Sequence, residues 1–208
     1  SARRVLDVGC GDGALGAALE ARGARVAGVE PDPEAAAVAS SRLSLVLPLR
    51  AEEALASAGP RPDVVILADV LEHLLDPLAV LRAARAALAP GGLLVFSVPN
   101  ATHASVLAGL FRGLWTRELE GIVADDPRLY AGRAGWVSLL AAGGFRVTSL
   151  RASEARTPFA SGDREAFLSA GLDPAELDAV QWLGTAEPAG VPGTTDIRGA
   201  VEEDGPLG

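Results

Sequence analysis

The sequence lacks lysine and methionine, contains one cysteine, and has no run of eighteen apolar residues. Without such a run, no membrane span is expected. The single thiol, Cys10, excludes an internal disulfide and fits a reducing compartment, which we expect to be the cytoplasm. No charged-then-apolar leader opens the chain, which enters a predicted strand within a few residues of Ser1. Because the chain begins at Ser1, lacks methionine and enters this strand so early, we expect it to be a trimmed form or a piece of a longer protein.

The charge balance also limits the possible partners. The 18 basic residues are all arginine, 27 residues are acidic, and the net charge is −9. A nucleic-acid duplex is not expected as a partner, because phosphate binding needs a concentrated basic surface. No cluster with metal-ligand spacing is apparent, so no metal is expected. The length of 208 residues suits one α/β domain with a sizeable core, and nothing in the pattern indicates the oligomeric state.

Residues 5–16 hold the most informative pattern, in which a short apolar run ends in glycines and passes into an alanine-rich helical pattern. Glycine lets the backbone turn sharply and approach a ligand closely, and a helix N-terminus favours an anionic or electron-rich group. The glycines of residues 11–16 match the dinucleotide fingerprint, and Glu30 ends the next predicted strand, where an acid would bind ribose hydroxyls. Asp7 is unusual for a dinucleotide fold, which usually carries apolar residues through the end of this strand. The pattern therefore predicts a site for a nucleotide-like ligand.

Apolar runs alternate with helical patterns along most of the chain, which predicts a doubly wound, mostly parallel α/β sheet with helices on both faces. Strands are expected at residues 4–8, 25–29, 43–47, 63–68, 93–98 and 145–150. Helices are expected at residues 13–22, from 33, from 77 to before 90, and at 135–143, 161–170 and 174–182. Residues 184–208 are expected to be mostly loop, with 197–201 as the candidate for a further strand.

Ligands in such sheets bind beyond the carboxyl ends of the strands, at the switch in strand order. Gly9, Glu30, Asp69 and Asn100 follow four different predicted strands. We therefore expect these four residues to meet at one crevice.

The string from Leu6 to Gly13, LDVGCGDG, resembles motif I of the class I S-adenosylmethionine (SAM)-dependent methyltransferases. Further segments resemble motifs of the same family in the same order: residues 29–32, 67–77, 88–94 and 141–145. The resemblance covers about residues 5–150 and implies a seven-stranded, Rossmann-like sheet that binds SAM and releases S-adenosylhomocysteine (SAH). Residues 99–105 resemble a bacterial branch associated with glycan or natural-product biosynthesis, of whose next segment only a remnant is found at residues 127–130.

The resemblance implies which residues form the cofactor site. They are Asp7, Gly9, Cys10, Gly11, Glu30, Pro31, Ala51, Glu52, Ala68 and Asp69. Glu30 is suited to accept both ribose hydroxyl hydrogens, and Asp69 is expected to face the methionine end. The family often has an aspartate after strand three, so here either Glu52 or the backbone of Ala51 is expected to contact the adenine. Residues 1–151 would form the SAM-binding core, and residues 152–208 a helical extension with a flexible tail.

The segment 101–133 is too long for a simple connection, and we expect it to cover the acceptor. Candidate acceptor-binding residues are Asn100, His103, Trp115 and Tyr130. His103 is the preferred general base for a hydroxyl acceptor because imidazole titrates near neutrality, although a lining or packing role stays open. His73 is the less favoured candidate, because in the resembling motif this histidine is often a structural hydrogen-bonder.

The expected activity is methylation of a hydroxyl on a small-molecule or glycan-type acceptor. N- or C-methylation by proximity alone stays open. A SAM-binding partner subunit or pseudoenzyme would keep Gly9, Gly11 and Glu30 without turnover. A nicotinamide oxidoreductase would share the glycine pattern, but Asp7 and the Leu-Glu-His segment of residues 71–73 speak against it.

Overall fold

The computed structural model describes residues 2–57, 59–113, 128–153 and 161–190, and the account below concerns these residues. Its elements, in chain order, are β1 Arg4–Val8, α1 Ala14–Glu20, β2 Arg25–Val29, α2 Pro33–Ser40, β3 Val46–Leu47, α3 Ala51–Ala56, β4 Val64–Ala68, the 3-10 turn η1 Leu71–His73, α4 Pro77–Ala87, β5 Leu93–Pro99, α5 Ala104–Phe111, α6 Arg133–Ala142, β6 Phe145–Ala152, α7 Ser161–Ser169, α8 Pro174–Asp178 and β7 Gln181–Pro188.

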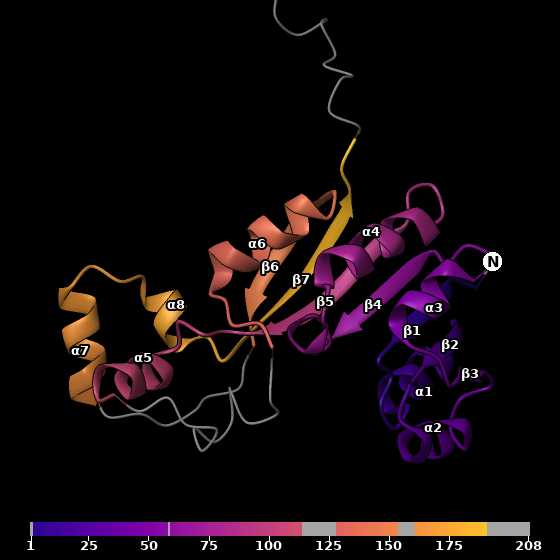
Figure 1. Ribbon diagram of the computed structural model, residues 1–208, viewed down its shortest axis with the longest axis horizontal. Helices are drawn as coiled ribbons and strands as arrows, with labels where there is room; N and C mark the ends of the chain where they lie inside the picture. Colours follow the sequence, from indigo (N-terminus) through magenta and orange to yellow (C-terminus); the bar gives the residue numbers. More distant parts are fainter. Residues whose placement is uncertain (1, 58, 114–127, 154–160, 191–208) are drawn as a thin grey trace, which may run out of the picture.

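The strands form one seven-stranded sheet in the order β3-β2-β1-β4-β5-β7-β6, which confirms the predicted fold class (Figure 1). The first five strands are parallel, whereas β7 runs antiparallel to both β5 and β6. The chain builds outward from β1 to β3 and then returns to place β4 against the other side of β1. This reversal opens a crevice at the carboxyl ends of β1 and β4, where ligands of such sheets bind.

Helices cover both faces of the sheet, so the central strands are apolar on both sides. In β4, four successive residues from Val64 to Leu67 are buried. One face packs against α3, α4 and α6, in a core that includes Leu55, Leu81 and Trp136. The other face packs against α1 and α2 around Ala39. A strand buried on both sides reads as a continuous apolar run, and this is why β4 was readily predicted.

Two helix starts are fixed by the residues that the sequence indicates. The Asp32 carboxylate accepts hydrogen bonds from the backbone N–H groups of Glu34 and Ala35, with Pro33 at the first helical position of α2. Asp76 caps α4 in the same way, through the N–H group of Ala79. Both caps satisfy N–H groups that would otherwise lack an intrahelical partner.

The seventh strand lies elsewhere than predicted. Gln181–Pro188 forms β7, whereas the sequence predicts the end of a helix and then a loop over these residues. The predicted helix beginning at Pro174 is real but short, because α8 ends at Asp178. The candidate that the sequence indicates for this strand, residues 197–201, lies outside the described residues.

A group of helices extends from the sheet beyond the carboxyl end of β5 and the start of β7. α5, α7 and α8 lie together at the left of Figure 1, away from α1 and α2. They share a small apolar core of Ala104, Ala108, Phe167 and Leu177. α5 falls within the segment predicted to cover the acceptor and was not predicted as a helix.

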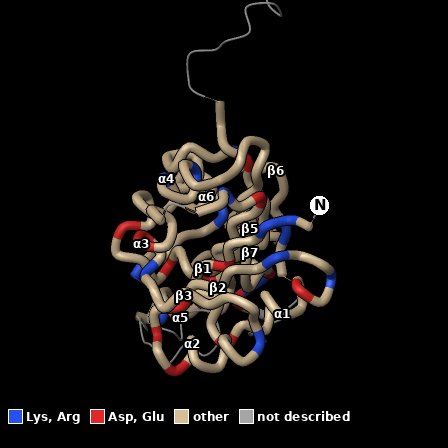
Figure 2. Tube along the Cα trace, turned by 90° about the vertical axis from the view of Figure 1, so that its right-hand side faces the viewer, with Lys and Arg blue, Asp and Glu red and all other residues tan. Residues whose placement is uncertain are grey.

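Along the Cα trace in Figure 2, arginines and acidic residues are interspersed. Among the described residues, no helix is both long enough and apolar enough to cross a membrane.

Candidate functional site

The loop after β1 is shaped by glycines in left-handed conformations. Gly9 has φ of +71°, and a Cβ at this position would lie 2.5 Å from Cγ2 of Val70. Gly11 has φ of +55°, and no atom lies within 4 Å of the place that its Cβ would take. The first glycine therefore allows close packing against the loop after β4, while the second leaves open space in which a ligand can approach the backbone.

Glu30 ties this glycine loop to the end of β2. One carboxylate oxygen accepts a hydrogen bond from the backbone N–H group of Gly11 at 2.9 Å, and the other accepts one from the backbone N–H group of Asp32 at 2.9 Å. A carboxylate offers about four acceptor sites, so each oxygen can accept one further hydrogen bond. Glu30 can therefore accept ribose hydroxyls while still holding the loop.

A cavity of about 450 Å³ lies beside Glu30, at the reversal of strand order. Its volume is within the range of small-molecule sites. Six of the ten predicted cofactor residues line it: Gly9, Glu30, Pro31, Ala51, Glu52 and Asp69. The other four, which are Asp7, Cys10, Gly11 and Ala68, belong to the same strand ends but are not part of its wall. Arg50, Val70 and Arg128 also line the cavity and were not predicted to.

Asp69 enters the cavity wall in a strained conformation. It is the only non-glycine residue of the described chain with positive φ, at +55°. Its Oδ1 atom accepts hydrogen bonds from Oγ of Ser97 at 2.9 Å and from Nε2 of Gln181 at 2.8 Å. Its N–H group donates to the carbonyl of Ser97 at 3.1 Å. Such strain persists only where the surroundings hold it in place, and it clusters at functional sites.

Two buried carboxyl groups lie beneath the site. Burial raises the pKa of Asp7 to about 6, and its Oδ2 atom has no hydrogen-bond partner among the described residues. Burial also raises the pKa of Glu72 to about 7, with a smaller contribution from the charge of Asp69. For Cys10, burial and the nearby carboxylates of Asp7 and Glu30 raise the pKa to about 11. The Cys10 thiol therefore stays protonated near neutral pH and is a poor nucleophile.

The two histidines have different surroundings. His103 is 1% exposed and caps α5, where its Nδ1 accepts a hydrogen bond from the N–H group of Ser105 at 3.2 Å. Burial lowers its pKa, and it does not line the cavity. His73, in contrast, is exposed and lines the cavity together with Leu74 and Leu75. A general base must reach its acceptor, and His73 is the one of the two histidines that lies on the wall of this cavity. Which of the two acts as the base stays a prediction.

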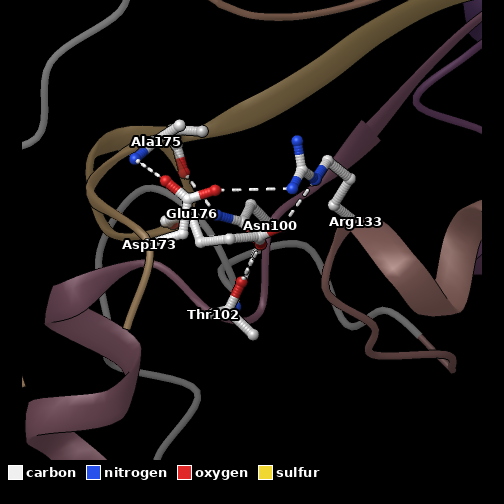
Figure 3. Close-up of polar contacts among 7 residues, drawn as sticks. Asn100, Thr102, Arg133, Asp173, Ala175 and Glu176 are labelled. Atoms are coloured by element: carbon white, nitrogen blue, oxygen red, sulfur yellow. Dashed lines mark hydrogen bonds and ion pairs between the residues drawn. The ribbon is translucent and has the colours of Figure 1, made fainter. Parts of the chain in front are cut away.

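Asn100 links three segments in the interior. It is fully buried, and its Nδ2 donates to the carbonyls of Glu176 at 2.6 Å and Ala179 at 2.8 Å. Oγ1 of Thr102 lies 2.6 Å from Oδ1 of Asn100 and 2.7 Å from Oε2 of Glu176, so its one hydrogen is shared between these two acceptors (Figure 3). Nε of Arg133 lies 2.8 Å from the same carboxylate. With both N–H bonds used internally, Asn100 has a structural role, and its contact with the acceptor stays a prediction.

The remaining acceptor candidates are not brought together by the described residues. Tyr130 is partly buried and packs against Val106 and Val180. Trp115 lies outside the described residues. No group of three or more His, Cys, Asp or Glu side chains in the described part of the chain is arranged to hold a metal ion.

Residues 1–150 match a family model described as a methyltransferase domain, which covers more than two thirds of the chain. The chain belongs to the class I SAM-dependent methyltransferases. SAM is the cofactor of this family and SAH the product that leaves the site. The open space beside Gly11 and the cavity beside Glu30 fit a nucleoside ligand at the place where motif I predicts it.

Curated relatives of this methyltransferase domain include O-methyltransferases. The ubiquinone biosynthesis O-methyltransferase of Cereibacter sphaeroides strain ATCC 17029 is 39% identical over 117 residues, which cover 54% of this chain and 47% of the relative. The enzyme of the same name from Xanthomonas campestris pv. campestris strain B100 is 40% identical over 108 residues, covering 49% and 45%. The chain thus spans about half the length of these relatives.

Solved structures show the same fold. A SAM-dependent methyltransferase from Archaeoglobus fulgidus superposes with a TM-score of 0.64 at 19% identity, covering 89% of this chain and 86% of that protein. At this identity the likeness concerns the fold alone.

Proposed function

We propose that this methyltransferase domain transfers the methyl group of SAM to a hydroxyl of a small-molecule acceptor. The observation that carries the proposal is the cavity at the strand reversal, with Glu30 on its wall and Asp69 fixed beside it. The curated relatives, named as O-methyltransferases of ubiquinone biosynthesis, support an oxygen acceptor. A hydroxyl of a glycan-type acceptor is the second class, supported by the resemblance of residues 99–105.

The residues of the chain have a limited set of tasks in this reaction. SAM supplies an activated methyl group, because its sulfur is a sulfonium cation. Glu30 binds the ribose hydroxyls, and Asp69 binds the ammonium group of the methionine part through a charge-assisted hydrogen bond. The glycine loop brings the backbone against the cofactor without a side chain in the way. What remains is to hold the acceptor oxygen in line with the methyl group and to exclude water.

A hydroxyl acceptor must also lose a proton as the methyl group arrives. His73 is our candidate for the base, since it is exposed and lies on the cavity wall. A positioned base contributes about 10²–10⁴-fold to the rate. We expect His73→Asn to lower kcat about a hundredfold with little change in SAM affinity. We expect His103→Asn to keep near-parent kcat, because an asparagine can still cap α5. The opposite result would restore His103 as the base.

The activity is tested by measuring SAH release with SAM and a panel of phenols, sugars and amines. Turnover with a hydroxyl compound that is lost in Glu30→Ala would support the proposal. Turnover only with amines would contradict O-methylation. Tight SAH binding without turnover across the panel would favour the non-catalytic alternative of a pseudoenzyme or partner subunit.

A further inference from the structure

A side chain of strand β7 contacts Asp69, a residue of the cavity wall. Gln181, the only glutamine of the chain, begins β7 and donates from Nε2 to Oδ1 of Asp69 at 2.8 Å. The two residues are 112 positions apart in sequence. Ser97 of β5 donates to the same oxygen at 2.9 Å. The two donors together fill the two acceptor sites of Oδ1, so Oδ2 is the oxygen left to bind a ligand.

The backbone of Gln181 is fixed from both sides. It pairs with Pro99 of β5, and its carbonyl accepts a hydrogen bond from the N–H group of Ser153 at 2.9 Å. Its own N–H group donates to Oγ of Ser153 at 3.3 Å. A side chain that starts from such a fixed backbone has a fixed point of attachment, which makes it a suitable support for a site residue.

The chemistry of the amide also suits this position. A neutral N–H donor orients the Asp69 carboxylate without cancelling its negative charge. A lysine here would place a second cation beside the one that the carboxylate is to bind, and a glutamate would repel the carboxylate.

We propose that Gln181, together with Ser97, is a positioning residue that holds Asp69 so that Oδ2 receives the ammonium group of the methionine part of SAM. The inference rests on the proposed function, since it requires SAM in the cavity. It makes β7 a determinant of selectivity for ligands that carry the amino-acid part. The adenosine end, held at Glu30, does not depend on this strand.

The binding of two ligands distinguishes a positioning role of Gln181 from a general effect of its substitution on the stability of the protein. SAH carries the amino-acid part, whereas 5′-methylthioadenosine keeps the adenosine and the thioether but lacks it. Calorimetry with Gln181→Leu is expected to show SAH binding about tenfold weaker than in the parent, the usual effect of losing a hydrogen bond to a charged group. The affinity for 5′-methylthioadenosine is expected to change less than twofold. Ser97→Ala removes the other donor and is expected to change the ratio of the two affinities in the same direction.

Thr185→Val is the matched control, because Thr185 lies on the same strand and contacts Oγ1 of Thr148 at 2.8 Å, away from the cavity. It is expected to leave both affinities unchanged. If Gln181→Leu weakens both ligands equally, or neither, the positioning role is wrong while the proposed function stands. If the parent itself fails to bind SAH, the proposed function is overturned together with this inference.

Discussion

Glu30 and Asp7 are acidic residues at the ends of neighbouring strands, and their surroundings differ. Each Glu30 oxygen accepts a backbone hydrogen bond, whereas Oδ2 of Asp7 is buried without a donor among the described residues. A carboxylate that is buried without hydrogen bonds is destabilised in its charged form. We therefore expect Glu30 to hold the glycine loop and to bind ligand, and we expect the contribution of Asp7 to stability to depend on pH.

The first prediction concerns Glu30. Glu30→Ala removes the acceptor of the ribose hydroxyls and releases Gly11, so SAH affinity should fall by about 1.5–3 kcal/mol, the scale of charge-assisted hydrogen bonds. Isothermal titration calorimetry measures this change. Glu34→Ala removes an exposed acid in the first turn of α2 and should bind SAH like the parent. Parent-like binding by Glu30→Ala would place the cofactor elsewhere.

Asp7 supplies a prediction on stability. Its pKa in the folded chain is about 6, above the ordinary value of 3.8, so folding favours the protonated form. The stabilising contribution is complete below about pH 4 and is lost as the pH rises through 6. Asp7→Asn cannot ionise, so its gain in free energy of unfolding over the parent should be larger at pH 8 than at pH 5 by roughly 1–2 kcal/mol.

Urea denaturation of the ligand-free protein at the two pH values measures this gain. Glu34→Gln, at an exposed position, should show the same difference from the parent at both pH values. A gain for Asp7→Asn that does not depend on pH would mean that Asp7 is already ionised in the folded chain at pH 5.

At the scale of whole elements, β7 is the strand that joins the parallel half of the sheet to β6. Within it, Gly184 faces Phe96 of β5, and an added Cβ would lie 2.5 Å from Cζ of Phe96 and 2.7 Å from the carbonyl oxygen of Ser149. Since the backbone oxygen cannot turn aside, Gly184→Ala should lower the free energy of unfolding by about 1–3 kcal/mol. Denaturant titration measures the loss. Gly190→Ala introduces its Cβ into open space and should be neutral. Equal stability of the two variants would show that β7 can shift without cost.

The same strand shows where the sequence stops being informative. Strands such as β4 are buried on both faces, so they appear in the sequence as continuous apolar runs. The glycine-rich loop after β1 is typical of a nucleotide-like ligand site. For these two reasons the half of the sheet around β1 and β4 could be predicted from the sequence. In β7 the buried residues are Trp182, Gly184 and Ala186. Glycine and alanine are too small to produce the alternation of large apolar and polar residues by which a strand is recognised in a sequence. Asp173, which precedes β7, caps α8 as predicted, but α8 has only five residues. From the cap alone the sequence predicts a longer helix that extends into the residues of β7. The contact of Gln181 with Asp69 forms only because β7 pairs with β5. No sequence pattern near either residue indicates this contact.

At the scale of the whole molecule, residues 128–133 bring the chain back beside the cavity at Glu30. The N–H groups of Arg128 and Leu129 donate to the carbonyl of Glu72 at 2.7 and 3.1 Å, and Arg128 lines the cavity. The Asn100–Thr102–Glu176–Arg133 network then anchors this segment to α8 and β5 (Figure 3). The network thereby links α8 and the segment before α5 to the carboxyl end of β5, and the apolar core of Ala104, Ala108, Phe167 and Leu177 joins α7 to them.

If this segment covers the site, a ligand in the cavity should hold it closed. Amide exchange at Arg128 and Leu129 requires their hydrogen bonds to Glu72 to open, and bound SAH should make that opening rarer. Hydrogen–deuterium exchange is therefore expected to slow at these two amides on addition of SAH, and to slow further with a hydroxyl acceptor. The amides of Leu183 and Thr185 in β7, away from the cavity, serve as the internal control for global stabilisation, and their exchange should slow less than that of Arg128 and Leu129. Slowing that is equal in β7 and in residues 128–129 would indicate global stabilisation. Unchanged exchange at Arg128 and Leu129, in a protein that binds SAH, would mean that this segment is only packed beside the sheet and does not cover the acceptor.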